Sequence, residues 1–407
     1  MAKKKKHELT LADGFDPVTG KFDTKILLKM YPNARYYFIL GGRGWGKTYP
    51  TLKLSLEDAL DKKGAFAYVR RYKESISDTF IQDLMAPQNS WIEDYTEGAA
   101  NKIGYWRKRW SAERWGMKEH QDGSESYERL EKFSPALGGA FAMSTWETSK
   151  GPDFGADKNG IKNIIIDEAL SSGGDYLSDE WNKFQNVVSS LVRENWEKDT
   201  KIWLLANAVS KYTCPYFRNL GITKKMMKKP GVTEIVYPPD EFGNQMSCIF
   251  CYLGLDKGDD ENKITAKDLT YSTFFAFPSS VSKSITHGEW ELAESSHLPS
   301  TVFNESDEVY QTFFVMDEDI VGCKIMRYCA TGRYYLFFYP AQKVAKNCYY
   351  FTLVTDLSKY AIIGLKTGHR VSVVLNDIWK TGQVYYSDNT CADMVHGWFK
   401  EASKRVI

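Results

Sequence analysis

Two short stretches of the sequence carry residues whose types and spacing suit the chemistry of phosphates. The first spans residues 41–48 and fits the P-loop pattern GxxxxGK[ST] in full. Its residues are Gly41, Gly42, Arg43, Gly44, Trp45, Gly46, Lys47 and Thr48. In such a loop the backbone N–H groups point at phosphate oxygens, and the helix that follows adds partial positive charge. We therefore expect this stretch to bind ATP.

The second stretch, Ile-Ile-Ile-Asp-Glu at residues 164–168, has the form of a Walker B strand. An apolar strand buried in a sheet would carry Asp167 to its carboxyl end, beside the P-loop. Thr48 and Asp167 are then the expected Mg²⁺ ligands, and Lys47 should contact the β- and γ-phosphates. Glu168 is placed to polarise a water as general base. A kinase has no need of such a carboxylate, so the pair favours ATP hydrolysis.

Each of these features also has a plainer interpretation. A flexible glycine loop can match the P-loop pattern by chance, and two solvated carboxylates can end an ordinary strand. Asn207 follows another apolar run and is a candidate to position the water against the γ-phosphate, or a residue that caps a turn. The two motifs support each other, because the P-loop would bind the phosphates and the Walker B strand would supply a metal ligand and a general base.

A mainly parallel sheet is the element that could position these residues. Residues 47–60 have apolar residues at helical spacing directly after the glycine loop. Four apolar runs are joined by longer segments, at residues 36–40, 65–69, 163–166 and 202–206. This order predicts an α/β domain with a largely parallel sheet. About ninety residues lie between the second and third runs, and we interpret them as an insertion, chiefly at about residues 90–135.

The chain of 407 residues is too long for one ordinary core, since single cores stop growing near about 250 to 300 residues. We expect a P-loop ATPase domain at residues 1–220, a basic and proline-bearing linker region at 221–265, and a smaller β-rich domain at 266–407. Within the last of these, residues 322–340 carry a hairpin signal, and residues 391–406 have the pattern of an amphipathic helix.

Composition narrows the choice of partners. A formal net charge of +1 gives the whole chain no strong attraction for polyanions, so contact with nucleic acid must come from local patches. Basic residues with interleaved aromatics at 105–115, and the lysines at 224–229, are candidates to grip DNA, or else ordinary solvated faces. No stretch approaches the roughly 18 apolar residues that span a bilayer, so no membrane partner is expected.

The seven cysteines are odd in number and scattered, which is typical of reduced thiols in a cytosolic compartment. Cys248 and Cys251 form a CxxC pair, but no second CxxC or HxxxH follows at the spacing of a zinc finger. Alternating residues of a strand are the favoured interpretation of this pair.

Several segments together resemble the genome-packaging ATPases of small tailed bacteriophages of the φ29 type, compact relatives of the terminase large subunits. The matching segments are residues 41–48, 68–73, 144–150, 164–168, 191–193 and 206–210. Residues 68–73 are the most distinctive of them, because P-loop and Walker B patterns occur in many families. The resemblance covers most of the first 215 residues and returns weakly near the C-terminus.

The resemblance implies a homomeric ring, in this group a pentamer, that docks on the portal of a procapsid and pushes double-stranded DNA inward as ATP is hydrolysed. Such a motor acts in the cytoplasm of the infected bacterial host, transiently on the procapsid portal. Whether a structural RNA takes part stays open. From the sequence alone Arg193 is better interpreted as a solvated helix residue, but the resemblance reverses this preference, because Arg193 matches the family's arginine finger. Further candidates to sense nucleotide or contact the next subunit are Arg70, Arg71 and Lys73, and Lys150 is a candidate cation that acts from a neighbouring subunit.

By resemblance the C-terminal domain has an RNase H-like fold with a degenerate nuclease site. An active site of that type gathers three or four carboxylates from strand ends. The available residues are Asp317, Glu318, Asp319, Asp356, Asp377 and Asp388, and the sequence shows no clear cluster among them. Two alternatives remain: a terminase-like motor with an active nuclease, and a nucleotide-gated assembly scaffold that is not an enzyme.

Overall fold

The chain was analysed as a computed structural model that describes most of its residues. The described ranges are 9–42, 44–122, 124–148, 160–171, 176–192, 199–207, 214–240, 243–254, 298–316, 319–345, 348–352 and 370–404. The chain divides into two compact units. In the described ranges the first unit runs to residue 254 and the second begins at residue 298.

The first unit is built on a mixed sheet that has ten strands within the described ranges. Nine of them follow one another across the sheet in the order β3 (Lys102–Trp106), β4 (Arg109–Glu119), β6 (Gly138–Ala142), β2 (Ala65–Arg70), β7 (Ile161–Asp167), β8 (Lys201–Asn207), β1 (Tyr36–Gly41), β10 (Ser247–Tyr252) and β9 (Gly231–Val236). The tenth strand, β5 (Glu125–Lys132), pairs with β4 alone.

The six strands from β6 to β10 in this order run parallel to one another. They include β1, β2, β7 and β8, which are the four apolar runs of the sequence. Each of these four is buried along nearly its whole length, as a parallel strand covered on both faces must be. The predicted α/β class with a mainly parallel sheet is confirmed.

Two parts of the chain contribute more to this sheet than the sequence indicated. Residues 138–142 form β6, which pairs in parallel with β2, so the segment between the second and third runs is not wholly an insertion. The expected linker at 221–265 is wrong for its described part, because that part supplies β9 and β10, and β10 pairs in parallel with β1. A short apolar run such as Ser247–Tyr252 has no clear periodicity, so the sequence does not show whether it ends the first domain or follows a linker.

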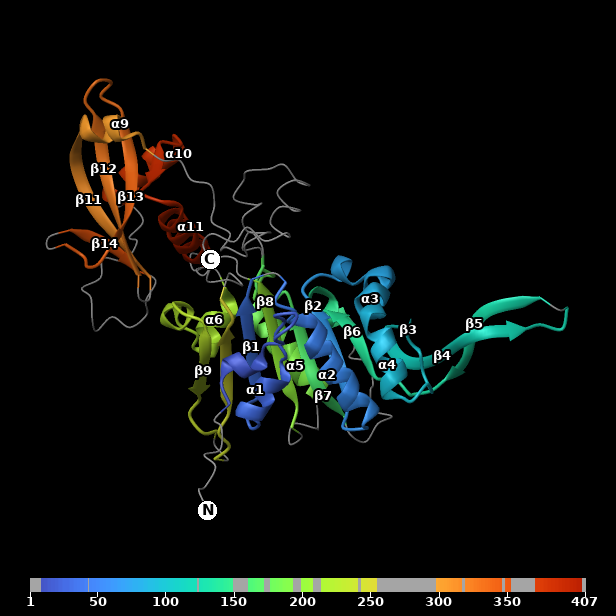
Figure 1. The fold of residues 1–407 in the computed structure, drawn as a ribbon. Helices are drawn as coiled ribbons and strands as arrows, with labels where there is room; N and C mark the ends of the chain where they lie inside the picture. Colours follow the sequence, from blue (N-terminus) through green and yellow to red (C-terminus); the bar gives the residue numbers. More distant parts are fainter. Residues whose placement is uncertain are drawn as a thin grey trace, which may run out of the picture. The chain divides into compact units, whose positions relative to one another are not determined.

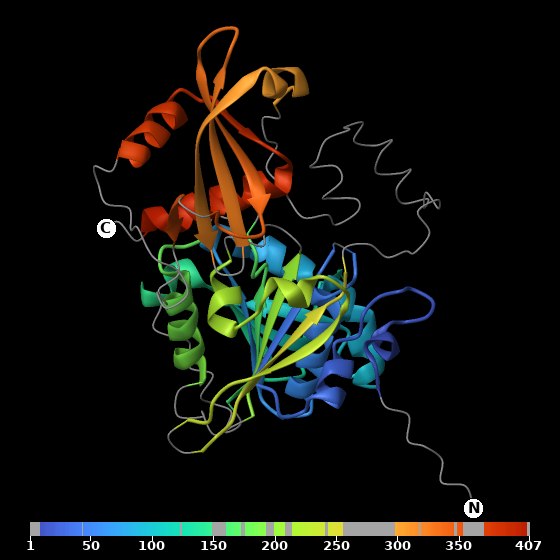
Figure 2. The same cartoon turned by 90° about the vertical axis from the view of Figure 1, so that its left-hand side faces the viewer.

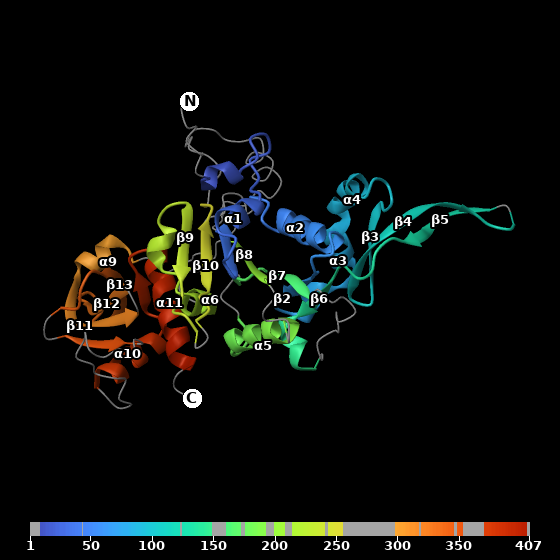
Figure 3. The same cartoon turned by 90° about the horizontal axis from the view of Figure 1, so that it is seen from below.

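Helices cover both faces of the sheet. Figure 3 shows α1 (Lys25–Met30) and α2 (Thr48–Leu60) on one face and α5 (Glu180–Val192) on the other. On the first face the ring of Tyr37 stacks on Trp203 with centroids 4.4 Å apart. The remaining helices in the described part of this unit are η1 (Leu11–Gly14), η2 (Lys73–Ile76), α3 (Asp78–Met85), η3 (Ala86–Gln88), α4 (Asn89–Tyr95), η4 (Met143–Thr148), α6 (Pro215–Leu220) and η7 (Lys224–Met227).

The far end of β4 and its partner β5 form a two-stranded ribbon that reaches beyond the rest of the first unit (Figure 1). Its side chains are largely exposed, and they include Met117 and Tyr127. The opposite end of β4 joins the main sheet through short pairings with β6 and a full pairing with β3. The predicted insertion at about residues 90–135 thus lies at the edge of the sheet.

In its described residues the second unit has a mixed sheet of five strands with helices, in the order β14 (Tyr349–Thr352), β11 (Ser306–Met316), β12 (Asp319–Tyr328), β13 (Tyr334–Ala341) and β15 (Val384–Tyr386). The predicted hairpin is confirmed as β12 and β13. The predicted terminal helix is confirmed as α11 (Asn389–Lys404), which lies across the strands in Figure 2. Two further helices are α9 (Ser300–Asn304) and α10 (Arg370–Lys380). This β-rich architecture is consistent with the expected RNase H-like domain.

Both cysteines of the CxxC pair are residues of β10, and both are fully buried. Burial raises the pKa of the Cys248 thiol to about 12 and that of Cys251 further still. Residues three positions apart in a strand point to opposite faces of the sheet, so the interpretation of the pair as strand residues is confirmed. Among the described helices, none is long and apolar enough to cross a membrane.

Candidate active site

The glycines of residues 41–48 are required by the path of the backbone. Gly44 and Gly46 have φ of 85° and 82°, a region that residues with a Cβ rarely adopt. A Cβ on Gly41 would lie 2.9 Å from the Cβ of Leu253, where β1 and the end of β10 approach each other. The loop thus turns sharply between the end of β1 and the start of α2. Arg43 lies outside the described residues.

Lys47 brings the loop and the end of β8 together. Its side chain is only 7% exposed, and Nζ donates to the carbonyl oxygens of Gly41 at 3.0 Å and Gly42 at 2.8 Å. The same ammonium donates to Oδ1 of Asn207 at 2.9 Å. Because β8 pairs in parallel with β1, with Asn207 opposite Gly41, the amide arrives at the P-loop as the sequence suggested.

Thr48 and Asp167 lie close together at the neighbouring strand end. Thr48 Oγ1 donates to Asp167 Oδ1 at 3.3 Å, and the other carboxylate oxygen accepts from the hydroxyl of Tyr68 at 2.7 Å. Tyr68 is fully buried, and burial together with the charge of Asp167 raises its pKa well above the usual value. The tyrosine therefore stays a hydrogen-bond donor and fixes the orientation of the carboxylate.

These two oxygen ligands suit Mg²⁺, which is commonly held by one or two protein groups together with waters and substrate phosphates. Within the described residues no group of three or more His, Cys, Asp and Glu side chains gathers as a metal site. Two protein oxygens are the number that a metal shared with phosphates takes from a protein, whereas a metal cage made by the protein needs more ligands.

Glu168 follows Asp167 in an unusual backbone conformation. Its φ is 56°, in the left-handed region that disfavours residues with a side chain. The side chain is 55% exposed, and its carboxylate pairs with Nη2 of Arg70 at 2.5 Å. Nη1 of Arg70 lies 3.7 Å from Asp167 Oδ2. Arg70, expected to contact nucleotide, therefore stands beside both carboxylates of the Walker B stretch.

Sequence reasoning missed the role of Arg71, which was a candidate to sense nucleotide or touch a neighbouring subunit. Its side chain is buried in its own chain, where Nε lies 2.8 Å from an oxygen of Glu180 on α5. Its other nitrogens donate to the backbone carbonyls of Glu168 at 3.1 Å and Ala169 at 2.9 Å. Burial acts to lower the pKa of Arg71, but the hydrogen bonds and charge of Glu180 outweigh it and raise that pKa. Arg71 thus anchors the turn that carries Glu168.

Four other candidates lie apart from this cluster or outside the described residues. The side chain of Trp45 is buried against Phe15, with ring centroids 5.3 Å apart. Lys73 is exposed at the start of η2, and its backbone N–H donates to Ser144 Oγ. Lys150 and Arg193 lie outside the described residues.

The carboxylates proposed for a nuclease site are similarly divided. Asp388 accepts from the backbone N–H of Cys391 at 2.8 Å, which caps the start of α11. Asp377 is exposed on α10, and Asp319 begins β12. Asp317, Glu318 and Asp356 lie outside the described residues.

The chain was compared with known proteins. No family model matches it, and no curated protein sequence does. Among solved structures it is similar to the Phi-28 gp11 DNA packaging motor, with 16% identity over 95% of this chain and 98% of that one and a TM-score of 0.46.

It is also similar to the packaging motor of bacteriophage Phi-29, with 15% identity over 94% of this chain and 99% of that one and a TM-score of 0.44. A third similar structure is the large terminase of a thermophilic bacteriophage, with 11% identity over 87% of this chain and 83% of that one and a TM-score of 0.32. Packaging motors and large terminases are the kind of protein that the sequence segments resemble.

Proposed function

We propose that this chain is an ATPase that binds Mg-ATP at residues 41–48 and hydrolyses it with Glu168 as general base. One observation carries the proposal. Lys47, Thr48, Asp167 and Asn207 are joined by hydrogen bonds at the carboxyl ends of β1, β7 and β8, directly at the start of α2. Ligands of open α/β sheets bind at this edge, and the start of a helix favours phosphate.

Each residue has a defined task in binding. The N–H groups of the glycine loop and the Lys47 ammonium hold the β- and γ-phosphates. The oxygens of Thr48 and Asp167 hold Mg²⁺, with Tyr68 fixing the carboxylate by its hydrogen bond of 2.7 Å. Bound Mg²⁺ neutralises charge on the phosphate oxygens and orients them. Asn207, next to Lys47, is placed to donate to the attacking water or the γ-phosphate.

Hydrolysis then needs one base and one path for the proton. The carboxylate of Glu168 accepts a proton from water as the water oxygen bonds to the γ-phosphorus. The bond from that phosphorus to the β–γ bridging oxygen breaks, which gives ADP and inorganic phosphate. Arg70, which pairs with Glu168 at 2.5 Å, keeps this carboxylate oriented beside the metal ligand.

The change Glu168→Gln tests this assignment, because it keeps the size of the side chain and removes the base. We expect kcat for ATP hydrolysis to fall by about 10²- to 10⁴-fold while ATP still binds. Glu97→Gln is a matched control, since Glu97 is also exposed with a positive φ of 52° but lies on the turn before β3. Unchanged hydrolysis in Glu168→Gln would overturn the proposal.

The proposal extends to what hydrolysis drives. The sequence segments that resemble φ29-type packaging ATPases support a ring of copies of this chain, a pentamer, that moves double-stranded viral DNA through a portal into a procapsid. This would take place in the cytoplasm of the infected host. If it is right, Glu168→Gln abolishes DNA packaging along with hydrolysis. Full packaging by that variant would instead favour the nucleotide-gated scaffold.

A further inference from the structure

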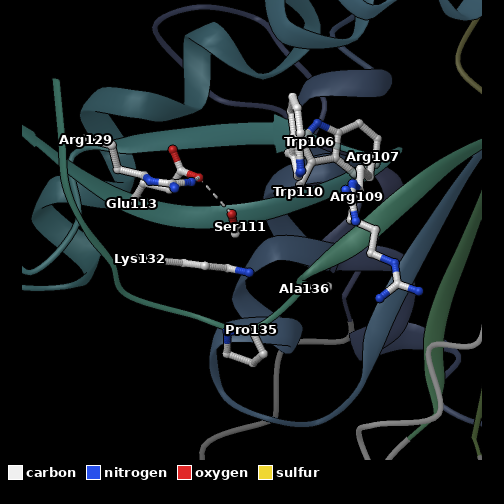
Figure 4. Close-up of a pocket in the computed structure, with 10 residues that line it drawn as sticks. All are labelled: Trp106, Arg107, Arg109, Trp110, Ser111, Glu113, Arg129, Lys132, Pro135 and Ala136. Carbon is white, nitrogen blue, oxygen red and sulfur yellow. Dashed lines mark hydrogen bonds and ion pairs between the residues drawn. The ribbon is translucent and has the colours of Figure 1, made fainter.

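The first unit has a pocket at the turn between β3 and β4. These two strands lie at one end of the sheet, and β6, β2, β7 and β8 separate them from the P-loop strand β1 in the strand order. The pocket has a volume of about 540 Å³, and its lining includes Trp106, Arg107, Arg109, Arg129 and Lys132. Figure 4 shows the two indole rings of the pocket on one side, Pro135 on the opposite side, and Lys132 extending between them. None of these residues has a part in the ATPase proposal.

The lining is strongly basic. It contributes Arg107, Arg109, Arg129 and Lys132 against a single carboxylate, Glu113. That carboxylate is buried and already bound within the protein: it pairs with Arg129 at 3.1 Å and also accepts from the indole N–H of Trp115 at 2.9 Å. The cations of the lining thus outnumber its one acid, whose charge Arg129 already balances, and a surface of this kind attracts an anion.

An aromatic surface stands beside these cations. Trp106 is 71% exposed, which is unusual for so large an apolar side chain. It ends β3 and is paired with Arg109 at the start of β4, and the guanidinium of Arg107 lies 5.9 Å from the centre of the Trp106 ring. The pocket thus combines a flat ring open to solvent with positive charges next to it.

The two-residue turn between β3 and β4 has a backbone conformation that favours residues other than the ones present. Arg107 and Lys108 are its two central residues, with φ of 48° and 63°. Two-residue hairpins of this kind prefer Asn-Gly, because the left-handed region brings most side chains too close to the backbone. Arg107 and Lys108 thus occupy two positions whose backbone conformation disfavours them.

We propose that this pocket binds an unpaired nucleotide of a nucleic acid strand, with its base stacked on Trp106 and its phosphates held by Arg107, Arg109 and Lys132. Cations that follow the backbone together with an aromatic ring that takes a base are the means by which proteins hold single strands. The bases of a duplex are stacked on one another, so a duplex could contact the cations of the pocket but could not stack a base on Trp106. This site is separate from the ATPase proposal and does not depend on it.

The test uses the full chain without ATP and measures fluorescence anisotropy with labelled oligo(dT), oligo(U) and a DNA duplex of equal length. We expect the single strands to bind more tightly than the duplex. Trp106→Ala should weaken single-strand binding by about tenfold or more and leave duplex binding nearly unchanged. Lys132→Ala should lower the slope of log K against log salt by about 0.7, the value for one lost phosphate contact. The two oligonucleotides show whether the strand is DNA or RNA.

Two variants on the same ribbon serve as matched controls. Tyr127→Ala removes an aromatic ring that is 60% exposed on β5, and Lys118→Ala removes a charge that is 56% exposed and pairs with Glu128. Both lie outside the pocket, and both should leave single-strand affinity unchanged. The proposal is overturned if Trp106→Ala binds like the wild type, if the duplex binds best, or if no strand binds more tightly than about 10⁻⁴ M. ATP hydrolysis by Trp106→Ala should stay normal, which separates this result from failure of the ATPase proposal.

Discussion

At the scale of single residues, Glu168 illustrates how a site can hold a side chain that its backbone does not favour. Its left-handed φ of 56° costs about 1–2 kcal/mol relative to an ordinary conformation. The neighbouring carbonyls accept from Arg71, and the carboxylate pairs with Arg70, so contacts on both sides maintain this geometry. Strain of this kind is common where a side chain must point in one direction for function.

Tyr68 offers a test of the metal ligands at the same scale. Its hydroxyl donates to Asp167 Oδ2, so Tyr68→Phe leaves the carboxylate free to rotate. Loss of such a partner of a metal ligand typically weakens metal binding about 10- to 100-fold. We expect the Mg²⁺ concentration that half-saturates ATP hydrolysis to rise by about that factor, as measured in a magnesium titration.

Tyr37→Phe is the control for this change. Tyr37 is also fully buried and its hydroxyl donates to the carbonyl of Tyr31 at 2.6 Å, on a strand that carries no metal ligand. Both variants lose one buried hydrogen bond, worth about 1 kcal/mol of stability. Only Tyr68→Phe should change the magnesium dependence, and an equal shift in both variants would contradict the assignment.

At the scale of elements, the pair formed by Arg71 and Glu180 links the end of β2, the turn after β7 and the first turn of α5. Glu180 also accepts from Tyr216 of α6 at 2.8 Å, so four elements meet around one buried carboxylate. Any shift of α5 along its axis would strain these bonds. The turn that carries Glu168 is thus joined to α5 through Arg71 and Glu180.

The change Arg71→Lys tests this connection. A lysine keeps the charge, but a single ammonium cannot reach Glu180 and both carbonyls at once, since it lacks the planar fork of arginine. We expect kcat for ATP to fall by about 10- to 100-fold with KM unchanged, because small misplacement of a catalytic group has effects of this size.

Stability and activity must be measured together for this variant. Circular dichroism gives the folded fraction, and kcat is then expressed per folded molecule. Arg114→Lys is the control, because Arg114 donates to the carbonyl of Gly98 at 2.8 Å in the ribbon and not at the site. If kcat per folded molecule is unchanged in Arg71→Lys, Arg71 serves stability alone.

At the scale of the whole molecule, the proposed ring predicts that each site is completed by a neighbouring copy. Arg193 is the proposed arginine finger, a group that is typically worth about 10³- to 10⁵-fold in rate. Arg193→Ala and Glu168→Gln subunits should each be nearly inactive alone. Mixed together they should regain hydrolysis, because an intact Glu168 in one subunit can meet an intact Arg193 from the next.

Mixing Lys47→Ala with Glu168→Gln subunits provides the control. Every site in such a mixture lacks either the phosphate-binding lysine or the base, so no neighbour can complete it. A mixture of Arg193→Ala and Glu168→Gln that shows only the average of its two components would place Arg193 in its own subunit, or outside catalysis. The measurement is the initial rate of phosphate release at fixed total protein.

The proposed domain boundaries belong to the same scale. The division into an ATPase domain at residues 1–220 and a C-terminal domain at 266–407 stays a proposal. Strands β9 and β10 lengthen the sheet of the first unit beyond the expected boundary, to at least residue 252. Long-range pairing of β10 with β1, more than two hundred residues earlier in the chain, is the reason that local sequence patterns missed it.

The sequence by itself determined the parts of this protein that local chemistry specifies. Three features are contiguous patterns: the P-loop spacing, the apolar runs of β1, β2, β7 and β8, and the carboxylates Asp167 and Glu168 at the end of β7. Their meeting at one edge follows from the rule that parallel strands end on the same side. For this reason Lys47, Thr48, Asp167 and Asn207 could be named in advance.

Only the tertiary structure decided which distant side chains meet. The contacts of Arg71 with Glu180, of Tyr68 with Asp167, and of the cations around Trp106 join residues from separate elements, and no local spacing encodes them. Their positions depend on strand register and on how helices pack against the sheet, where one residue of shift turns a side chain to the opposite face. The tertiary structure therefore shows the contacts that support the predicted nucleotide site, and it shows the basic pocket at the turn between β3 and β4.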